Sequence, residues 1–137
     1  MNSFILDQRL AADSQTIGAS QHCDVRLMSD SRFLWLLLVP KYADIIEWHD
    51  LPDGVGAYIF DEVRMASRWV KAFHHSDKIN IGALGNQVQQ LHIHVIGRNI
   101  GDAAWPNPVW GSGSAVAYGE DQAKKIIAAC RTALSLS

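Results

Sequence analysis

The sequence predicts an α+β fold in which a mostly antiparallel sheet packs against one long helix. Two apolar segments, residues 23–27 and 33–39, flank a short polar turn, which is the spacing of a hairpin. A long helical pattern follows, and two further strand-like segments, 78–81 and 90–96, come after it. Strands on both sides of one helix favour α+β over a doubly wound parallel sheet.

The two segments of the hairpin have different apolar patterns. Cys23, Val25 and Leu27 alternate with charged residues, which indicates a strand with one buried face. Residues 33–39 are all apolar and end at Pro40. This run favours a central strand covered on both faces, although its periodicity alone also allows a buried helix.

The long helix is predicted to begin near residues 50–53 and to continue to about residue 73. Pro52 suits a first turn, and the apolar stripe extends over about five turns. Its members are Val55, Ile59, Val63, Ala66, Val70 and Phe73. The same spacing predicts a second amphipathic helix within 123–134, near the end of the chain.

The length of 137 residues predicts a single domain over 1–137. We expect residues 1–21 to be a peripheral lead-in, 23–98 the core and 99–137 a C-terminal region. The net charge is -2 and the Lys and Arg residues are scattered, so binding to a nucleic acid polymer is not expected.

The cysteines and the apolar runs bear on the location of the protein. Cys23 and Cys130 have no metal or redox spacing, and one pair is a poor framework for a secreted protein, although a disulfide stays open. The N-terminus does not resemble a signal peptide. The longest apolar run, 33–40, is far shorter than the ~20 residues that span a bilayer. We therefore expect a reduced, cytoplasmic protein without membrane contact.

The segment 90–96 carries the chemistry. Side chains of a strand alternate between faces, so Gln90, His92 and His94 are predicted to share one face and to meet one ligand. A neutral imidazole is a good nucleophile near neutral pH, and attack on phosphorus would give a phosphoramidate. A neighbouring histidine could stabilise the phosphate oxygens. This pattern suits phosphoryl or nucleotidyl transfer without a metal or other cofactor.

Two other interpretations of the histidines stay open. Both rings could be hydrogen-bonded structural residues, or His92 and His94 could be a metal-ligand pair, since His-x-His on a strand often binds metals. A metal site would need a third ligand soon after His94. Arg98 and Asn99 stand there instead, so no metal site is predicted.

The segment Gln90-Leu91-His92-Ile93-His94-Val95-Ile96 is similar to the motif of the histidine-triad (HIT) family. The segments 38–41, 78–80 and 85–87 resemble the flanking parts of that family in order and spacing. The resemblance spans about residues 23–98, and it implies a sheet of about five strands with a C-terminal helix. Residues 105–111 resemble a bacterial branch often labelled diadenosine-tetraphosphate-hydrolase-like.

The resemblance implies roles for individual residues. It places the nucleophile at His92 and a phosphate contact at His94. Gln87 falls on a loop position that contacts phosphate or the leaving group, and Asn80 resembles a nucleotide-contacting asparagine. Ser29 falls where the family often contacts ribose, although a serine of a hairpin turn is an equally good interpretation.

This sequence departs from the family at two positions. Gln90 replaces the first histidine; an amide can orient a neighbour but cannot carry a charge. An upstream histidine of several members falls on Trp35, which could belong to the core or form a wall of the base pocket. Trp105 and Trp110 could stack on a base or act as packing anchors. The family also implies a homodimer.

The sequence therefore predicts a nucleotide hydrolase or transferase. His92 would attack the α-phosphate of a dinucleoside polyphosphate or a nucleoside phosphoramidate, and a nucleotidyl-histidine would form. One alternative is a nucleotide-binding module with weak or lost catalysis, of which Gln90 would be the mark. The other alternative is a metal-dependent enzyme that uses His92 and His94.

Overall fold

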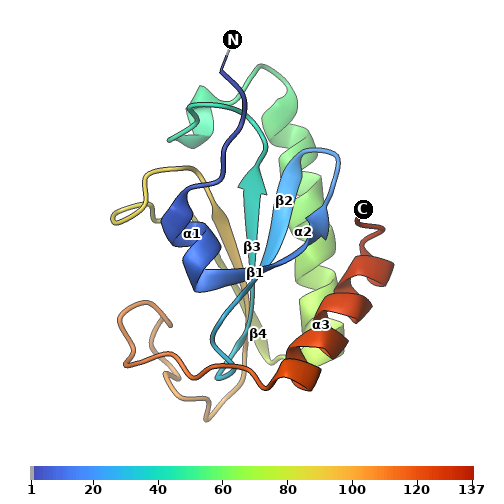
Figure 1. Cartoon of the computed structure of the whole chain (residues 1–137). Helices are drawn as coiled ribbons and strands as arrows, with labels where there is room; N and C mark the ends of the chain where they lie inside the picture. Colours follow the sequence, from blue (N-terminus) through green and yellow to red (C-terminus); the bar gives the residue numbers. More distant parts are fainter. Residues whose placement is uncertain (1) are drawn as a thin grey trace.

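The computed structural model describes residues 2–137 and contains a five-stranded antiparallel sheet of order β1-β2-β3-β5-β4 (Figure 1). The strands are β1 Ser14–Ala19, β2 Cys23–Met28, β3 Leu34–Pro40, β4 Lys78–Gly82 and β5 Ile93–Arg98. The α-helices are α1 Gln8–Asp13, α2 Val55–His74 and α3 Glu120–Ala133, and a 3-10 turn, η1, spans Trp48–Asp50. The predicted α+β fold is confirmed.

The predicted hairpin is formed by β2 and β3. Cys23 pairs with Pro40 and Leu27 pairs with Leu36. Every residue of β3 is buried, because this central strand is covered on both faces. The unbroken apolar run is therefore a strand and not a helix.

The two faces of the sheet are covered by different parts of the chain. Apolar residues of one face pack against α2 and α3 around Val25, Leu38 and Val95. The other face is covered by α1 and by parts of the segments 2–7 and 99–118 (Figure 1). Its buried cluster comprises Leu10, Phe33, Trp35, Leu37, Val39, Ile96, Ala104 and Val109. His94 of β5 belongs to this second face, because it pairs across the sheet with Leu37.

Residues 1–21 are more than the peripheral lead-in that we expected. In the described part, α1 lies over the second face and β1 extends the sheet by pairing with β2. β1 is a polar edge strand with an irregular register between Thr16 and Gly18, so it has no clear period-two pattern. Its Ile17 is nevertheless fully buried in the main core.

Two boundaries also differ from the prediction. The long helix begins at Val55, after a left-handed residue at Gly54, and η1 occupies part of the expected first turn. The last strand begins at Ile93, so Gln90 and His92 precede it. His75 ends α2 in a left-handed conformation, as the helix cap.

Three further observations concern packing and composition. β5 approaches α2 closely at Gly97, where an added Cβ would lie 2.9 Å from Val70 Cγ1. Cys23 and Cys130 are both free and buried, so they form no disulfide. No helix within residues 2–137 combines the length and the apolar character needed to cross a membrane.

Candidate active site

His92 lies just before β5 and its ring is held by the main chain. Its Nδ1 atom is 2.7 Å from the carbonyl oxygen of Gln90, and its residue is only 7% exposed. A carbonyl oxygen can only accept a hydrogen bond, so Nδ1 must carry the hydrogen. In the neutral ring, Nε2 is then the atom with the free lone pair, which is the form required of a nucleophile.

His94 has the opposite tautomer. Its Nδ1 lies 2.9 Å from the indole Nε1 of Trp35, and an indole N–H can only donate. The hydrogen of the neutral His94 ring must therefore be on Nε2. Burial, together with the nearby His92, lowers the pKa of His94 to about 3, so this ring is neutral near pH 7.

The two rings form a pair with complementary roles. Their centroids are 4.9 Å apart, and the planes meet edge to face at 64°. Within residues 2–137, neither Nε2 atom has a hydrogen-bond partner. His92 thus offers a lone pair and His94 an uncharged N–H donor, a combination that can attack a phosphorus and bind one of its oxygens.

The side chain of Gln90 does not join this pair as we expected. The expectation assumed that the strand includes residue 90, whereas β5 begins at Ile93. The amide instead donates from Nε2 to the carbonyl of Ile5 and accepts at Oε1 from the N–H of Asp7, both at 2.8 Å. Gln90 acts on His92 through its main-chain carbonyl and on the N-terminal segment through its side chain.

A cavity of about 150 Å³ opens beside His92. It lies between η1, the loop after β4 and the residues leading into β5. A second cavity of about 560 Å³ adjoins it and is walled by the N-terminal segment. Both cavities are lined by Ile46, Gln89 and Gln90. The smaller cavity has room for a phosphate group beside His92, and the larger has the size of a small-molecule site.

The predicted substrate-binding residues lie at different distances from the histidines. Asn80, on β4, accepts from Arg98 at 2.9 Å through Oδ1. Gln87 is exposed in the loop before β5 and does not line the cavity beside His92. Ser29 follows β2 at the end of the sheet that is opposite His92, and its N–H bonds to Asp13. The structure thus brings His92 and His94 together but does not bring Ser29 to them.

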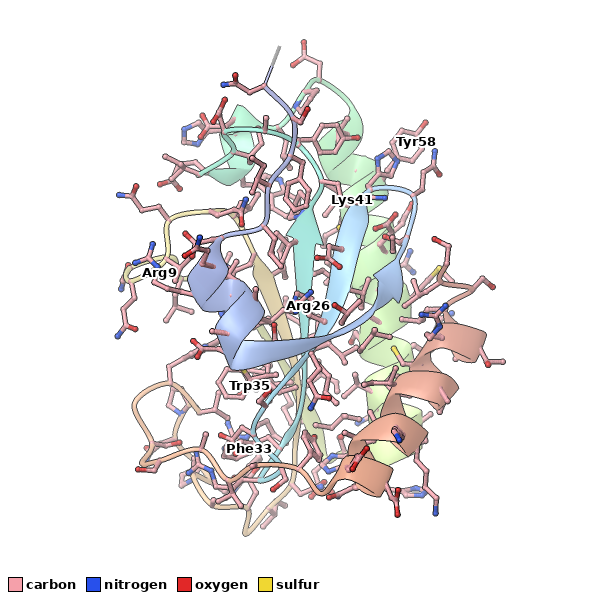
Figure 2. The ribbon with its side chains drawn as sticks, viewed as in Figure 1. Arg9, Arg26, Phe33, Trp35, Lys41 and Tyr58 are labelled. Carbon is pink, nitrogen blue, oxygen red and sulfur yellow. The ribbon has the colours of Figure 1, made fainter. Side chains whose placement is uncertain are left out.

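Trp35 and Trp110 contact the ring of His94, whereas Trp105 packs against Arg98. Trp35 is 7% exposed and belongs to the core of the second face (Figure 2). Trp110 meets His94 edge to face at a centroid distance of 5.2 Å and packs over Gly82. Trp105 lies against the guanidinium of Arg98, 5.7 Å from its ring centroid. The contacts of Trp35 and Trp110 limit the motion of the His94 ring.

The sequence analysis missed two groups of polar residues. Arg98 is 1% exposed and pairs with Asp102 at 2.8 and 3.0 Å. In the sequence, Arg98 stood out only as a residue that occupies the place of a third metal ligand after His94. Asp7 and Arg9 lie in the N-terminal segment and contact residues of the loop 85–90, which is far away in the sequence. No local sequence pattern could indicate this contact.

The family comparison agrees with this geometry. A model of the HIT domain matches residues 9–100. The chain belongs to the HIT domain family. Proteins with this domain are generally nucleotide hydrolases or transferases. The match includes most of α1, the sheet and the histidine pair.

Several solved HIT proteins are similar over nearly the whole chain. A histidine triad protein of Sinorhizobium meliloti is 43% identical, with 94% of this chain and 96% of that chain covered and a TM-score of 0.92. One from Bradyrhizobium japonicum is 39% identical, with coverage of 97% and 99% and a TM-score of 0.95. One from Marinobacter aquaeolei is 40% identical, with coverage of 99% and 100% and a TM-score of 0.95. No curated protein matches the chain.

Proposed function

We propose that this HIT protein is a nucleotide hydrolase or transferase that acts at an α-phosphate through a nucleotidyl-histidine at His92. The substrate would be a dinucleoside polyphosphate or a nucleoside phosphoramidate. The observation that carries the proposal is the pair of opposite tautomers, because it leaves a free lone pair on His92 beside a neutral donor on His94. The bacterial hydrolase branch suggested by residues 105–111 and a cytoplasmic location are part of the same proposal.

In the first step, Nε2 of His92 forms a bond to the α-phosphorus. The bond from phosphorus to the leaving group breaks, and its electron pair departs with that group; a phosphate leaves as an anion, and an amine takes up a proton from solvent. The His92 ring becomes positively charged and keeps its Nδ1 hydrogen, which the carbonyl of Gln90 stabilises. The Nε2–H of His94 can donate a hydrogen bond to a non-bridging oxygen of the phosphate as negative charge develops on that oxygen.

In the second step, water or another acceptor attacks the phosphorus. With water, a proton is released to solvent and the bond from phosphorus to His92 Nε2 breaks. Its electron pair returns to the ring, and a nucleoside monophosphate leaves. The neutral state of His94 means that it contributes a hydrogen bond and not a full charge to these steps.

The decisive experiment replaces His92. His92→Asn should lower turnover of diadenosine tetraphosphate and of adenosine 5′-phosphoramidate by about 1,000-fold or more, since removal of a nucleophile has effects of that order or larger. Wild type, quenched with acid-free denaturant, should carry label from an α-³²P substrate, and His92→Asn should not. Undiminished turnover in the variant would remove His92 from its role.

His75→Asn is the matched control. His75 is exposed and left-handed, and asparagine tolerates that conformation. The control should keep wild-type turnover. A loss of activity equal to that of His92→Asn would show that the effect does not depend on the proposed nucleophile.

The same measurements separate the two alternatives. Nucleotide binding without a labelled protein would favour a binding module. Activity that depends on a metal, with metal found in the purified protein, would favour the metal-dependent enzyme. Within residues 2–137, no cluster of three or more His, Cys, Asp or Glu side chains is placed to hold a metal ion. A metal on His92 and His94 would thus need further ligands from elsewhere.

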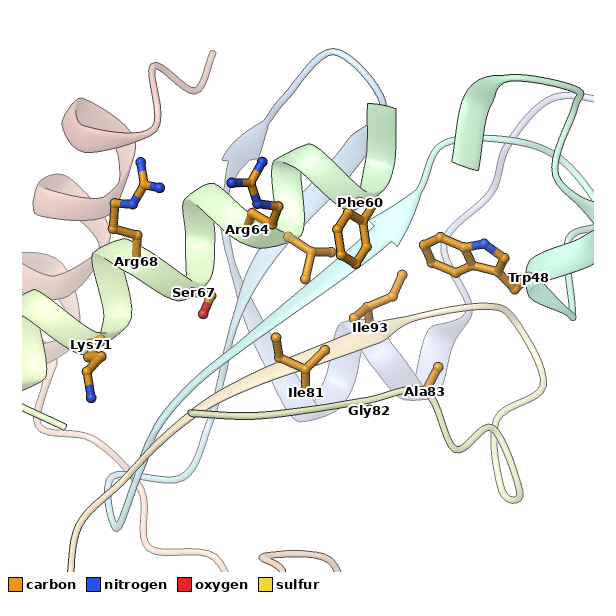
Figure 3. A pocket seen from close by; sticks show the side chains of 11 residues that line it. Trp48, Phe60, Arg64, Ser67, Arg68, Lys71, Ile81, Gly82, Ala83 and Ile93 are labelled. Atoms are coloured by element: carbon orange, nitrogen blue, oxygen red, sulfur yellow. The ribbon is translucent and has the colours of Figure 1, made fainter. Parts of the chain in front are cut away.

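We also propose that the protein is a homodimer formed through α2 and β4. β4 is an edge strand, so one side of its backbone is free for pairing. Beside it, a groove of about 570 Å³ runs between α2 and β4 (Figure 3). Phe60 and Ile81 line this groove and are 57% and 52% exposed. Large exposed apolar groups of this kind are typical of protein contacts.

The oligomeric state can be tested with one charged residue. Ile81→Glu should convert a dimer to a monomer in light scattering, because a carboxylate would be placed in the apolar contact. Val116→Glu is the control, since Val116 is also 52% exposed but lies in the C-terminal region. A monomeric wild type at micromolar concentration would refute the dimer.

A further inference from the structure

The N-terminal segment, residues 2–9, is bonded to the region that leads into β5. The Gln90 amide donates to Ile5 and accepts from Asp7, on either side of Leu6. A neighbouring parallel strand would offer the same pair of bonds to a residue at this position. Gln90 therefore holds the segment as a strand would, and Leu6 packs on the core of the second face.

Two further contacts tie the same segment down. Arg9 donates from Nη1 to the carbonyl of Gln87 at 2.9 Å, and Asp7 holds the guanidinium at 3.1–3.2 Å. Figure 2 shows Arg9 extending from α1 on the side of the loop between β4 and β5. Asn2 donates to Asp44 at 2.8 Å. The segment is thus bonded to both loops that border the site.

This segment forms one wall of the larger cavity. The wall consists of Asn2, Ser3, Ile5, Asp7 and Arg9. The cavity adjoins the smaller one at His92 through Ile46, Gln89 and Gln90. A substrate whose α-phosphate lies at His92 has this larger cavity as the adjoining space for the rest of the molecule.

The orientation of His92 does not depend on the Gln90 side chain. The Nδ1 hydrogen of His92 is bound by the main-chain carbonyl of Gln90, which any residue at position 90 would supply. The side chain and the main chain of Gln90 consequently serve two separable purposes.

We propose that Gln90 is a positioning residue that docks the N-terminal segment as a wall of the substrate site, and that it acts on substrate binding and not on the chemical step. This inference rests on the proposed function. It assigns a role to the glutamine that stands in place of the first histidine of the motif. Arg9 is the second anchor of the same wall.

Kinetics test the proposal by the separation of KM from kcat. Gln90→Met should raise KM for diadenosine tetraphosphate about tenfold, the order expected for two lost hydrogen bonds. kcat should stay within about threefold of wild type, since an intact His92 sets it. Arg9→Met alone should raise KM in the same way. Added to Gln90→Met, it should raise KM by less than a further factor of about three, because both changes release the same segment. Gln21→Met, an exposed glutamine in the turn after β1, is the matched control.

Two measurements without turnover separate this inference from the proposed function. Hydrogen exchange of the amides of residues 5–9 should be faster in Gln90→Met and unchanged in Gln21→Met. Binding of AMP, followed by calorimetry, should weaken about tenfold in Gln90→Met even if wild type shows no turnover.

A fall in kcat with constant KM would assign Gln90 to the chemistry and overturn the proposal. Unchanged exchange of residues 5–9, or AMP binding that is absent in wild type or equal in both proteins, would also overturn it. Loss of the labelled intermediate in His92→Asn with unchanged KM in Gln90→Met would refute this inference alone.

Discussion

The buried, neutral state of His94 makes the stability of the protein depend on pH. The pKa of His94 is lowered from 6.5 to about 3 by burial and by the neighbouring His92. Between these two values the unfolded chain binds a proton at this position and the folded chain does not. The contribution of the neutral His94 ring to the free energy of unfolding is therefore fully present above pH 6.5 and is lost as the pH falls toward 3.

The size of this effect follows from the two pKa values. Each pKa unit corresponds to about 1.4 kcal/mol, so integration from pH 7 to pH 5 gives a loss of about 2 kcal/mol in the free energy of unfolding. With a typical urea slope of about 2 kcal/mol/M, the unfolding midpoint should fall by about 1 M. Asp102, whose pKa is lowered to about 2, adds little in this range because it changes its protonation at lower pH.

Urea unfolding at pH 7 and pH 5 measures the effect, and His94→Gln isolates it. The variant has a different stability at pH 7, but its loss between the two pH values should be smaller than that of wild type by about 2 kcal/mol. The pKa of His74 is also lowered by burial, so His74 adds to the pH dependence of stability in both proteins. This part cancels when the loss in His94→Gln is subtracted from the loss in wild type. Equal losses in wild type and His94→Gln would refute the assignment of a neutral, buried His94.

Three further substitutions test the contacts around the site by urea unfolding. Trp35→Phe should cost about 1–3 kcal/mol because the buried Nδ1 of His94 loses its donor, and turnover should fall as the other tautomer becomes populated. Unchanged stability and turnover would argue against that bond. Gly97→Ala should cost about 1–3 kcal/mol, since its methyl group would lie 2.9 Å from a valine methyl of α2; a neutral effect would mean that the helix moves freely. Asp102→Asn should cost about 3–5 kcal/mol because Arg98 is 1% exposed and would lose its counter-ion, and a loss below about 1 kcal/mol would contradict this.

The apolar patterns of the sequence predict the regular part of the fold well. The period-two segment at Cys23–Leu27, the unbroken run before Pro40 and the helical stripe each correspond to an observed element. These patterns are informative because a buried face imposes its period directly on the sequence. β1 has no such period, because it lies at the edge of the sheet and its register is irregular.

The histidine motif predicts the proximity of His92 and His94 but not the place of Gln90. The sequence indicates which residues could share a face, but the boundary of a strand depends on its pairing with its neighbours. The pairing of β5 with β3 and β4 begins only at Ile93, after Gln90. The tautomers follow from Trp35 and from a main-chain carbonyl, and neither partner can be assigned from local spacing.

The sequence by itself determined the fold class, the hairpin, the long helix and the two histidines that belong to the HIT motif, because local periodicity and spacing encode them. Only the tertiary structure decided the protonation of each ring, the pairing of Arg98 with Asp102 and the docking of the N-terminal segment by Gln90. The physical reason is that hydrogen bonds and ion pairs depend on atoms brought together by folding; Asp7 and Gln90 are 83 residues apart in the chain and 2.8 Å apart at their bonded atoms.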